Sequence, residues 1–227
     1  MAASGEGQRR LVRLLLPGSF NPITIAHLRM IELARDFLTR SLNLELEKAV
    51  LSPVGDSYGE KKNLQPANLR VEMCRLATQD MDWIDVDDWE SQQPTWVRSL
   101  EVLQRQKELA LQQEPPVQRV MLLCGADVIT SFSKPGLWSK EHIESILRDF
   151  GVLVVTRKGA ESFTQHVPPE CEHVIGGLHR VEEWIPNEIS STKIRFGIKN
   201  GFSVRHLTPT PVLQFIQDRK LYETEPE

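Results

Sequence analysis

Two segments far apart in the sequence carry residues suited to binding an anion. The first covers residues 18–27, reads Gly-Ser-Phe-Asn-Pro-Ile-Thr-Ile-Ala-His, and follows an apolar run. A glycine lets the backbone approach a ligand closely, and free N–H groups at a helix start attract phosphate oxygens. Thr24 and His27 are three residues apart and can face the same spot. The pair is equally typical of a helix cap in which Thr24 is the capping residue, so the segment alone leaves both interpretations open.

The second segment lies near the C-terminus and reads Glu-Ile-Ser-Ser-Thr-Lys-Ile-Arg over residues 188–195. Ser190 or Ser191 is suited to cap a helix, but no Glu or Gln follows three residues later, as a capping box requires. Cations in the first turn oppose the helix dipole by up to about 1 kcal/mol each. A bound di- or triphosphate would neutralise Lys193 and Arg195, whereas in the alternative interpretation both cations extend into water.

The composition restricts the class of protein. With 27 Lys and Arg against 31 Asp and Glu, the formal net charge is -4, which argues against binding nucleic acid through overall positive charge. No apolar run approaches the roughly 18 residues that span a bilayer, so we expect no membrane partner. The three cysteines are widely separated and form no C-x-x-C, which favours a reducing intracellular compartment, cytoplasmic or nuclear. The Walker A and G-x-G-x-x-G fingerprints are absent as well.

Alternating apolar and amphipathic segments predict the fold class. Apolar runs predict strands over residues 11–16, 48–54, 83–86, 120–124 and 152–156. Helices are expected around 30–38, from Pro66, over 95–113 and 140–150, from Ser190 to near Gly201, and from Pro211. This order is typical of an α/β protein with a Rossmann-like, doubly wound parallel sheet, whose ligands bind beyond the carboxyl ends of the strands. We expect a disordered tail over residues 1–10, then a single domain over 11–227 with a small helical addition from about residue 185.

Taken together, the two segments resemble a known superfamily. The pattern G-x-F-x-P-x-T-x-x-H after the first strand and I-S-S-T-x-x-R near the C-terminus resemble the nucleotidyltransferase superfamily of adenylyl and cytidylyl transferases. Within it, the chain is similar to the eukaryotic-type nicotinamide mononucleotide adenylyltransferases from Leu14 to Tyr222. Further matching segments are 52–56, 89–91, 122–127 and 137–138. The superfamily usually has H-x-G-H at residues 24–27, and only His27 is retained here, as in the eukaryotic subgroup.

The resemblance implies an ATP site made by both segments. The residues it assigns to ATP are Gly18, Ser19, Phe20, Thr24, His27, Lys61, Lys62, Thr192, Lys193, Ile194 and Arg195. Of these, His27, Lys61 and Arg195 would be catalytic, although which of Lys61 and Lys62 contacts the phosphates is left open. Mg²⁺ would be carried with ATP, and no residue is expected as a metal ligand.

The resemblance also implies a site for the pyridine mononucleotide. Its residues would be Gly18, Ser19, Trp96, Ser99, Gly125, Asp127, Leu137, Trp138, Arg157 and Asn187. Tryptophan faces hold a flat heteroaromatic ring well, with cation–π attraction added for a charged pyridinium. Alternatively, the tryptophans are only large core residues, and we expect at least Trp83 to be one. Asp127 would both cap a helix and contact the substrate.

The implied activity is adenylyl transfer from ATP to nicotinamide mononucleotide, and to nicotinic acid mononucleotide as well. The 5′-phosphate of the acceptor is already anionic, so in-line attack needs no general base and yields NAD, or its acid analogue, and pyrophosphate. Two alternatives are a sister transferase with another phosphorylated acceptor and a nucleotide-binding chaperone. The preference between the two mononucleotides and the formation of a homo-oligomer are left open by the sequence.

Overall fold

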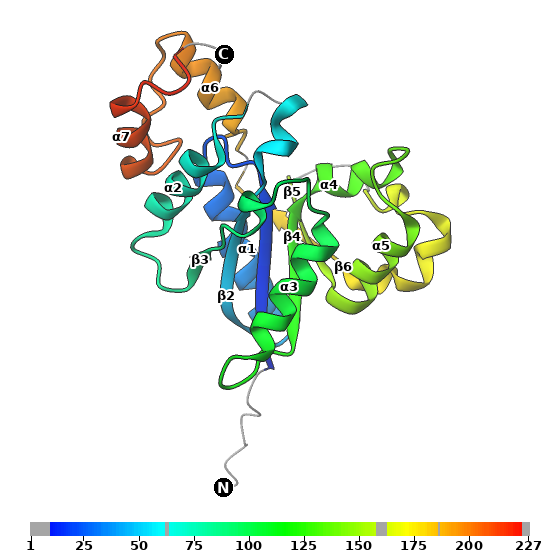
Figure 1. Ribbon diagram of the computed structural model, residues 1–227. Helices are drawn as coiled ribbons and strands as arrows, with labels where there is room; N and C mark the ends of the chain where they lie inside the picture. The colour runs from blue at the N-terminus through cyan, green and yellow to red at the C-terminus, as the bar shows by residue number, and fades with distance from the viewer. Residues whose placement is uncertain (1–9, 62–63, 158–162, 186, 224–227) are drawn as a thin grey trace, which may run out of the picture.

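A parallel sheet forms the centre of the protein. The computed structural model describes residues 10–61, 64–157, 163–185 and 187–223. Within them, six strands lie in the order β3-β2-β1-β4-β5-β6 (Figure 1). The strands are β1 (Arg10–Gly18), β2 (Leu44–Pro53), β3 (Ile84–Val86), β4 (Arg119–Gly125), β5 (Val152–Arg157) and β6 (Leu178–Glu183). All neighbouring pairs are parallel, which confirms the expected Rossmann-like α/β class.

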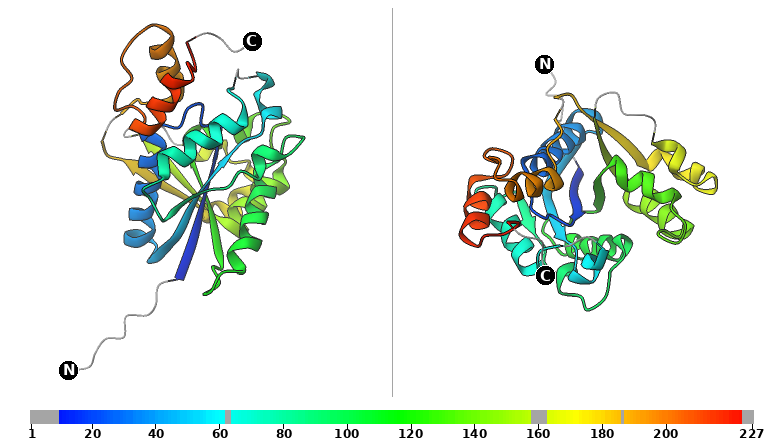
Figure 2. Two further views of the ribbon diagram at one scale, coloured as in Figure 1. Left: turned by 60° about the vertical axis from the view of Figure 1, so that its left-hand side comes forward. Right: turned by 90° about the horizontal axis from the view of Figure 1, so that it is seen from above.

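Helices cover both faces of this sheet (Figure 2). Apolar residues of α1 (Ile25–Ser41), α2 (Ala67–Thr78) and α7 (Thr210–Asp218) share one core. Residues of α3 (Ser99–Leu111), α4 (Ala126–Thr130), α5 (Lys140–Ser145) and the π-helical η4 (Ile146–Phe150) share the other. Successive residues of β1 alternate between the cores, with Leu14 in the first and Leu15 in the second. The apolar runs are continuous because these strands are buried on both faces.

Short helical segments make up much of the remaining connections. They are η1 (Asp56–Lys61), η2 (Glu90–Gln92), η3 (Ser131–Ser133), η5 (Thr164–His166) and η6 (Pro169–Gly177). Helix α6 (Ser191–Lys199) follows β6, and together with α7 it lies above the carboxyl ends of the strands in Figure 1.

The topological switch point, where the order of the strands reverses, lies at the centre of the sheet. Strands β1 and β4 are neighbours, and the chain leaves β1 toward α1 on one face and β4 toward α4 on the other. In sheets of this order, ligands bind outside the carboxyl ends of the strands at that point. The connections that start at Gly18 and Gly125 therefore lie where a site is expected.

Three details differ from the sequence-based expectations. Arg10 is the first residue of β1 rather than part of a tail. Strand β6 was not expected, because its sequence Leu-His-Arg-Val-Glu-Glu has few apolar residues, as an edge strand permits. Trp83 lies at the margin of the core rather than inside it, half-buried, with the Arg35 guanidinium 4.7 Å from its ring centre.

Candidate active site

The loop after β1 folds back on the end of its own strand. Phe20 adopts a φ of 44°, and its buried ring lies against Gly18. A Cβ atom at Gly18 would come within 3.0 Å of that ring, a tighter contact than most side chains make. Any larger residue would push the Phe20 ring away, so glycine favours the tight turn between β1 and α1.

Thr24 and His27 form the cap of helix α1. The Thr24 Oγ1 accepts a hydrogen bond from the His27 backbone N–H at 3.4 Å, and the Thr24 N–H donates to His27 Nδ1 at 3.0 Å. This is a capping box in which histidine takes the place of Glu or Gln. The capping interpretation of Thr24 is thus confirmed, and Nε2 of the imidazole has no hydrogen-bond partner among the described residues.

The same contacts determine the protonation state of His27. Because Nδ1 accepts a backbone N–H, the neutral ring carries its proton on Nε2. Burial lowers the pKa of His27 to about 4, since the charged imidazolium would lose its hydration. The ring also contacts the edge of Phe20, with centroids 5.3 Å apart. At neutral pH, His27 is therefore an uncharged, fixed N–H donor.

Helix α6 is attached to this first loop. Ser190 is its N-cap and accepts from the Lys193 N–H at 3.3 Å. Arg195 Nη1 donates to the Asn21 carbonyl at 2.8 Å, and Ser191 Oγ donates to the Pro22 carbonyl at 2.7 Å. The two segments that the sequence analysis singled out therefore meet at one edge of the sheet.

Both cations of α6 have partners within the protein, which neither interpretation of the sequence included. Lys193 pairs with the carboxylate of Glu188, which lies just before the helix, and Arg195 bonds the first loop. Both side chains of the Lys193–Glu188 pair are exposed, 58% and 74%. Exposed pairs contribute only about 0 to 1 kcal/mol, so Lys193 can exchange Glu188 for a phosphate at little cost. Compensation of the helix dipole therefore does not itself require a ligand.

The end of β4 presents Asp127 to solvent. Gly125 occupies the N-cap position of α4, and Asp127 lies in the first turn with an exposed side chain. A Cβ at Gly125 would approach Asp127 Oδ1 to 2.6 Å, so the carboxylate folds over the glycine. The expected cap by Asp127 was wrong because Gly125 holds that position, and the carboxylate is left open beside the switch point.

Two tryptophans lie in the connections beyond β3 and β4. Trp138, which follows Leu137, is half-buried, donates from Nε1 to Ser131 Oγ at 2.9 Å, and meets Phe132 edge-on at 5.0 Å. These contacts hold its ring in one orientation. Trp96 is 42% exposed, with the Arg98 guanidinium 5.4 Å from its ring centre, and precedes Ser99 at the start of α3. An exposed indole face of this kind is available to a flat ligand.

A small cavity opens beside the first turn of α1. Its volume is about 160 Å³, and its lining consists of Ile25, Ala26, Arg29, Glu183, Ile185, Asn187 and Ile189. Asn187, which the sequence assigned to the mononucleotide, accepts from the Ile189 N–H at 3.4 Å. Arg29 pairs with Glu183 at 3.2 Å across the cavity wall. Sequence analysis missed Glu183 and its neighbours because it did not recognise β6, which carries Glu183 to this edge.

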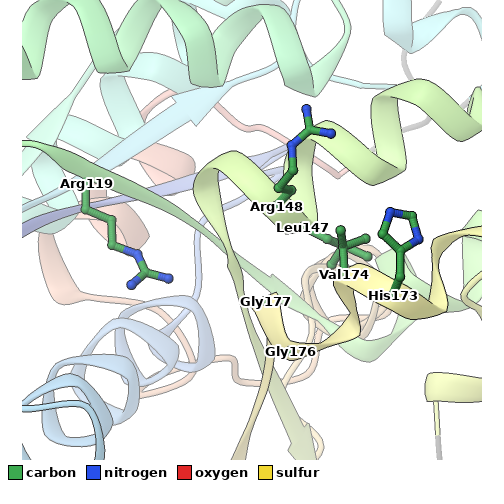
Figure 3. Close-up of a pocket in the computed structure, with 7 residues that line it drawn as sticks. All are labelled: Arg119, Leu147, Arg148, His173, Val174, Gly176 and Gly177. Atoms are coloured by element: carbon green, nitrogen blue, oxygen red, sulfur yellow. The ribbon is translucent and has the colours of Figure 1, made fainter.

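A larger cavity of about 350 Å³ lies at the opposite end of the sheet (Figure 3). It is lined at the amino end of β4 by Arg119 and across from it by Arg148, His173 and the Gly176–Gly177 segment. Arg148 already pairs with Glu144 and Asp149, each at 2.9 Å. None of the expected site residues lines this cavity, so its greater volume does not mark the predicted site.

Three of the expected residues are described only by their backbone or not at all. Lys61 ends η1, which follows the carboxyl end of β2, and Arg157 is the last residue of β5. Lys62 lies outside the described residues. The roles of these three residues stay predictions.

Asn21 was overlooked at the sequence level, although it connects four segments. Its side-chain Oδ1 accepts from the Gln65 N–H at 3.2 Å and from the Tyr222 hydroxyl at 2.8 Å, while its carbonyl accepts from Arg195. Burial raises the pKa of Tyr222, so its hydroxyl stays protonated and donates. Asn21 is 2% exposed, and asparagine is an unusual core residue. The polar residue between Phe20 and Pro22 was the signal in the sequence that could have pointed to it.

The described residues contain neither a cluster of metal-ligating side chains nor a helix suited to cross a membrane. No group of three or more His, Cys, Asp or Glu residues in this part of the chain could hold a metal ion. In the same residues, the helices are all too short or too polar to cross a bilayer.

Comparison with known proteins identifies close similarities. Residues 15–196 match the family described as Cytidylyltransferase-like. The chain is 38% identical to nicotinamide/nicotinic acid mononucleotide adenylyltransferase 2 of Caenorhabditis elegans, over 93% of this chain and 98% of the relative. It is equally identical, 38%, to nicotinamide/nicotinic acid mononucleotide adenylyltransferase 1 of Bos taurus, over 98% of this chain and 92% of the relative.

A solved structure has the same fold. It is Plasmodium falciparum nicotinic acid mononucleotide adenylyltransferase complexed with NaAD, with a TM-score of 0.64 and 17% identity. The match covers 95% of this chain and 98% of that one. At this identity the comparison bears on the fold alone.

Proposed function

The chain belongs to the cytidylyltransferase-like family, and from this we infer that it transfers the adenylyl group of ATP to a pyridine mononucleotide. Relatives that are 38% identical over nearly the whole chain are named for nicotinamide and nicotinic acid mononucleotide, so we propose both as acceptors. The products are NAD, or its acid analogue, and pyrophosphate.

One observation in particular supports this proposal. Arg195 of α6 reaches the carbonyl of Asn21 at 2.8 Å, directly beside the capped start of α1 and beyond the carboxyl end of β1. Backbone N–H groups at a helix start, a neutral N–H donor and a guanidinium are then concentrated in one place. Such a set suits a polyphosphate whose charge must be distributed over several donors.

The chemistry needs few groups from the protein. An oxygen of the acceptor 5′-phosphate attacks the α-phosphorus of ATP, the bond from that phosphorus to the bridging oxygen breaks, and pyrophosphate leaves with the electron pair. The nucleophile is anionic at neutral pH, so the protein supplies positioning and electrostatic stabilisation. We assign His27 Nε2–H to a non-bridging phosphate oxygen and Arg195 and Lys193 to the developing negative charge. Lys61 or Lys62 would serve the leaving pyrophosphate.

The ATP donor enters as its magnesium complex in this proposal. Phosphate oxygens and water are the ligands that Mg²⁺ prefers, and the ion keeps several of its waters. It would supply further neutralisation of the triphosphate. The protein's own part is to hold that complex between the first loop and α6.

The acceptor site lies around the two tryptophan-bearing connections. We assign Trp96 and Trp138 to the pyridine ring, because one indole is exposed and the other is held rigidly by Ser131 and Phe132. Asp127 and Asn187 would contact the polar parts of the mononucleotide. The remaining assignments, which the family pattern supports, are Ser99, Gly125, Leu137 and Arg157.

The state of the cysteines supports a reducing cellular compartment. Cys74, Cys124 and Cys171 are buried free thiols, as is usual where the medium is reducing. We therefore propose an intracellular location, cytoplasmic or nuclear, which imaging of a fluorescent fusion in cells would test.

A product assay tests the activity. The protein is mixed with ATP, Mg²⁺ and, separately, nicotinamide mononucleotide, nicotinic acid mononucleotide, phosphopantetheine and phosphocholine. We expect pyrophosphate and a dinucleotide of matching mass with the first two acceptors only. Another adenylylated product would select a sister transferase instead. Nucleotide binding without any turnover would select the chaperone alternative.

A further inference from the structure

Arg70 is a buried charge that the proposed chemistry does not use. It lies on α2, has 0% exposure, and heads the fully buried side chains of the described residues by volume. Its neighbours on the helix include the apolar Val71 and Met73. Burying a guanidinium is costly unless its donors are satisfied, so its partners are informative.

The guanidinium donates four hydrogen bonds to three segments. Nε donates to the Gln65 carbonyl at 2.7 Å, and Nη1 donates to the Ser19 carbonyl at 2.9 Å. Nη2 donates to the Val54 carbonyl at 2.7 Å and to Asp56 Oδ1 at 3.1 Å. Three of these acceptors are backbone carbonyls, and the Asp56 side chain is 63% exposed. The arrangement requires the planar fork of arginine, because a lysine ammonium has three donors at one point.

The three segments are parts of the proposed ATP site. Ser19 belongs to the loop after β1, whereas Val54 and Gln65 lie at the two ends of the connection that includes Lys61. Gln65 in turn donates its N–H to Asn21, whose carbonyl binds Arg195. A single buried side chain thereby links the first loop to both ends of the lysine-bearing connection, in addition to the direct hydrogen bonds from the Val54 N–H to the Gly18 carbonyl and from the Gln65 N–H to Asn21.

We propose that Arg70 is a positioning residue for ATP. It does not touch the nucleotide, and it acts by holding the two loops at the separation that one triphosphate spans. This inference rests on the proposed function. Loss of the fork should let the loops separate, and a displacement of about 1 Å can cost about 100-fold in rate. The effect should fall mainly on ATP, because both loops that Arg70 holds are assigned to ATP, whereas of the residues assigned to the acceptor only Gly18 and Ser19 lie there.

The test compares Arg70→Lys and Arg70→Ala with a matched control on the same helix. Arg75 is 51% exposed and pairs with Asp88 at 2.8 Å, so Arg75→Lys and Arg75→Ala serve as controls. For each variant, kcat and the KM values for ATP and mononucleotide are measured well below its Tm. We expect Arg70→Lys to raise the KM for ATP about 10-fold or more and to lower kcat, with the mononucleotide KM changed less than about 3-fold. The Arg75 variants should match wild type.

Two additional measurements keep the test decisive if an Arg70 variant folds poorly. Asp56→Ala removes one of the four acceptors from an exposed position, and we expect a rise of about 2- to 5-fold in the KM for ATP alone. Millimolar methylguanidine should restore activity to Arg70→Ala by occupying the vacated position, and it should not affect Arg75→Ala.

Hydrogen exchange separates this inference from the proposed function. Amides of residues 18–24 and 55–61 should exchange faster in Arg70→Lys than in wild type, a result that needs no turnover. Wild-type protein that makes no dinucleotide would defeat the proposed function and leave this measurement intact. Wild-type kinetics and exchange in Arg70→Lys would overturn the role of Arg70. Equal changes in both KM values, following the loss of stability, would overturn it too.

Discussion

His27 differs from the other proposed phosphate ligands because it carries no charge at neutral pH. Its Nδ1 accepts the Thr24 N–H, and burial lowers its pKa from 6.5 to about 4. A pKa that is lower in the folded state contributes stability above the unfolded value, and this contribution is lost as pH falls through about 4. The residue therefore resists protonation through the physiological range.

NMR spectroscopy of the ring nitrogens checks this state. We expect the His27 imidazole to remain the Nε2–H tautomer from about pH 8 down to about pH 5.5, without a titration step near the ordinary histidine pKa of about 6.5. The exposed His173 is recorded in the same spectra for comparison. A midpoint near 6.5 for His27 would contradict the assignment of a neutral donor.

Arg195 combines a structural contact with a proposed catalytic role. Arg195→Ala should lower kcat about 100-fold or more, the usual effect of removing a donor to developing charge. It should also cost about 1.5 to 3 kcal/mol of stability, because the hydrogen bond to the Asn21 carbonyl is lost. Lys199→Ala, at the other end of α6, is the control and should retain activity. Steady-state kinetics with thermal denaturation measures both effects, and near-normal kcat/KM in Arg195→Ala would refute the catalytic role.

At the level of elements, the proposed site divides the two substrates between the connections beyond the strands, apart from Gly18 and Ser19, which are assigned to both, and Asn187, which is assigned to the mononucleotide. The first loop and α6 form one side, whereas the connections with Trp96 and Trp138 follow β3 and β4. Such division is usual in doubly wound sheets, where strands give rigidity and the connections give chemistry. Substitutions on one group of connections should therefore affect one substrate.

Trp138→Leu tests this division. We expect it to raise the KM for the mononucleotide about 10-fold or more, since the stacking face is lost, with the KM for ATP nearly unchanged. Trp83→Leu is the matched control, because Trp83 directly precedes β3 at the amino end of the sheet. Initial-rate kinetics with each substrate varied gives the answer. Equal effects of the two variants would argue that Trp138 is only a packing residue.

At the scale of the whole molecule, one buried carboxyl should make stability depend on pH. Glu90 is 5% exposed and accepts from Ser52 Oγ at 2.5 Å. Burial raises its pKa to about 7, against the opposing effects of the Ser52 hydrogen bond and the charge of Arg70. A raised pKa contributes stability below the unfolded value of 4.5, and that contribution is lost as pH rises through about 7.

Thermal denaturation of Glu90→Gln checks this coupling. The amide cannot ionise, so the Tm of the variant relative to wild type should increase between about pH 5 and about pH 8. Glu45→Gln, at an exposed position of β2, is the control. A pH-independent difference for Glu90→Gln would show that this carboxyl has the same pKa in the folded and unfolded chain.

Much of the fold was predictable because its signals are local. The apolar runs of β1, β2, β4 and β5 reflect burial on both faces, and glycines, prolines and capping residues separate them from helices. The edge strand β6 escaped prediction because two of its six residues are exposed and only two are buried, so its sequence lacks that run. The site shows the same contrast. Its glycine-containing loop and its serine-capped helix could be recognised from local sequence, whereas the hydrogen bonds between them could not.

The sequence by itself determined the alternation of strands and helices and the two segments that are proposed to bind phosphate. Only the tertiary structure decided the partners of the polar groups: Glu188 for Lys193, Asn21 for Arg195, and the carbonyls of Ser19, Val54 and Gln65 for Arg70. The physical reason is that periodicity records whether a side chain is buried, which is a local property. The identity of a hydrogen-bond partner 174 residues away depends on how the elements pack.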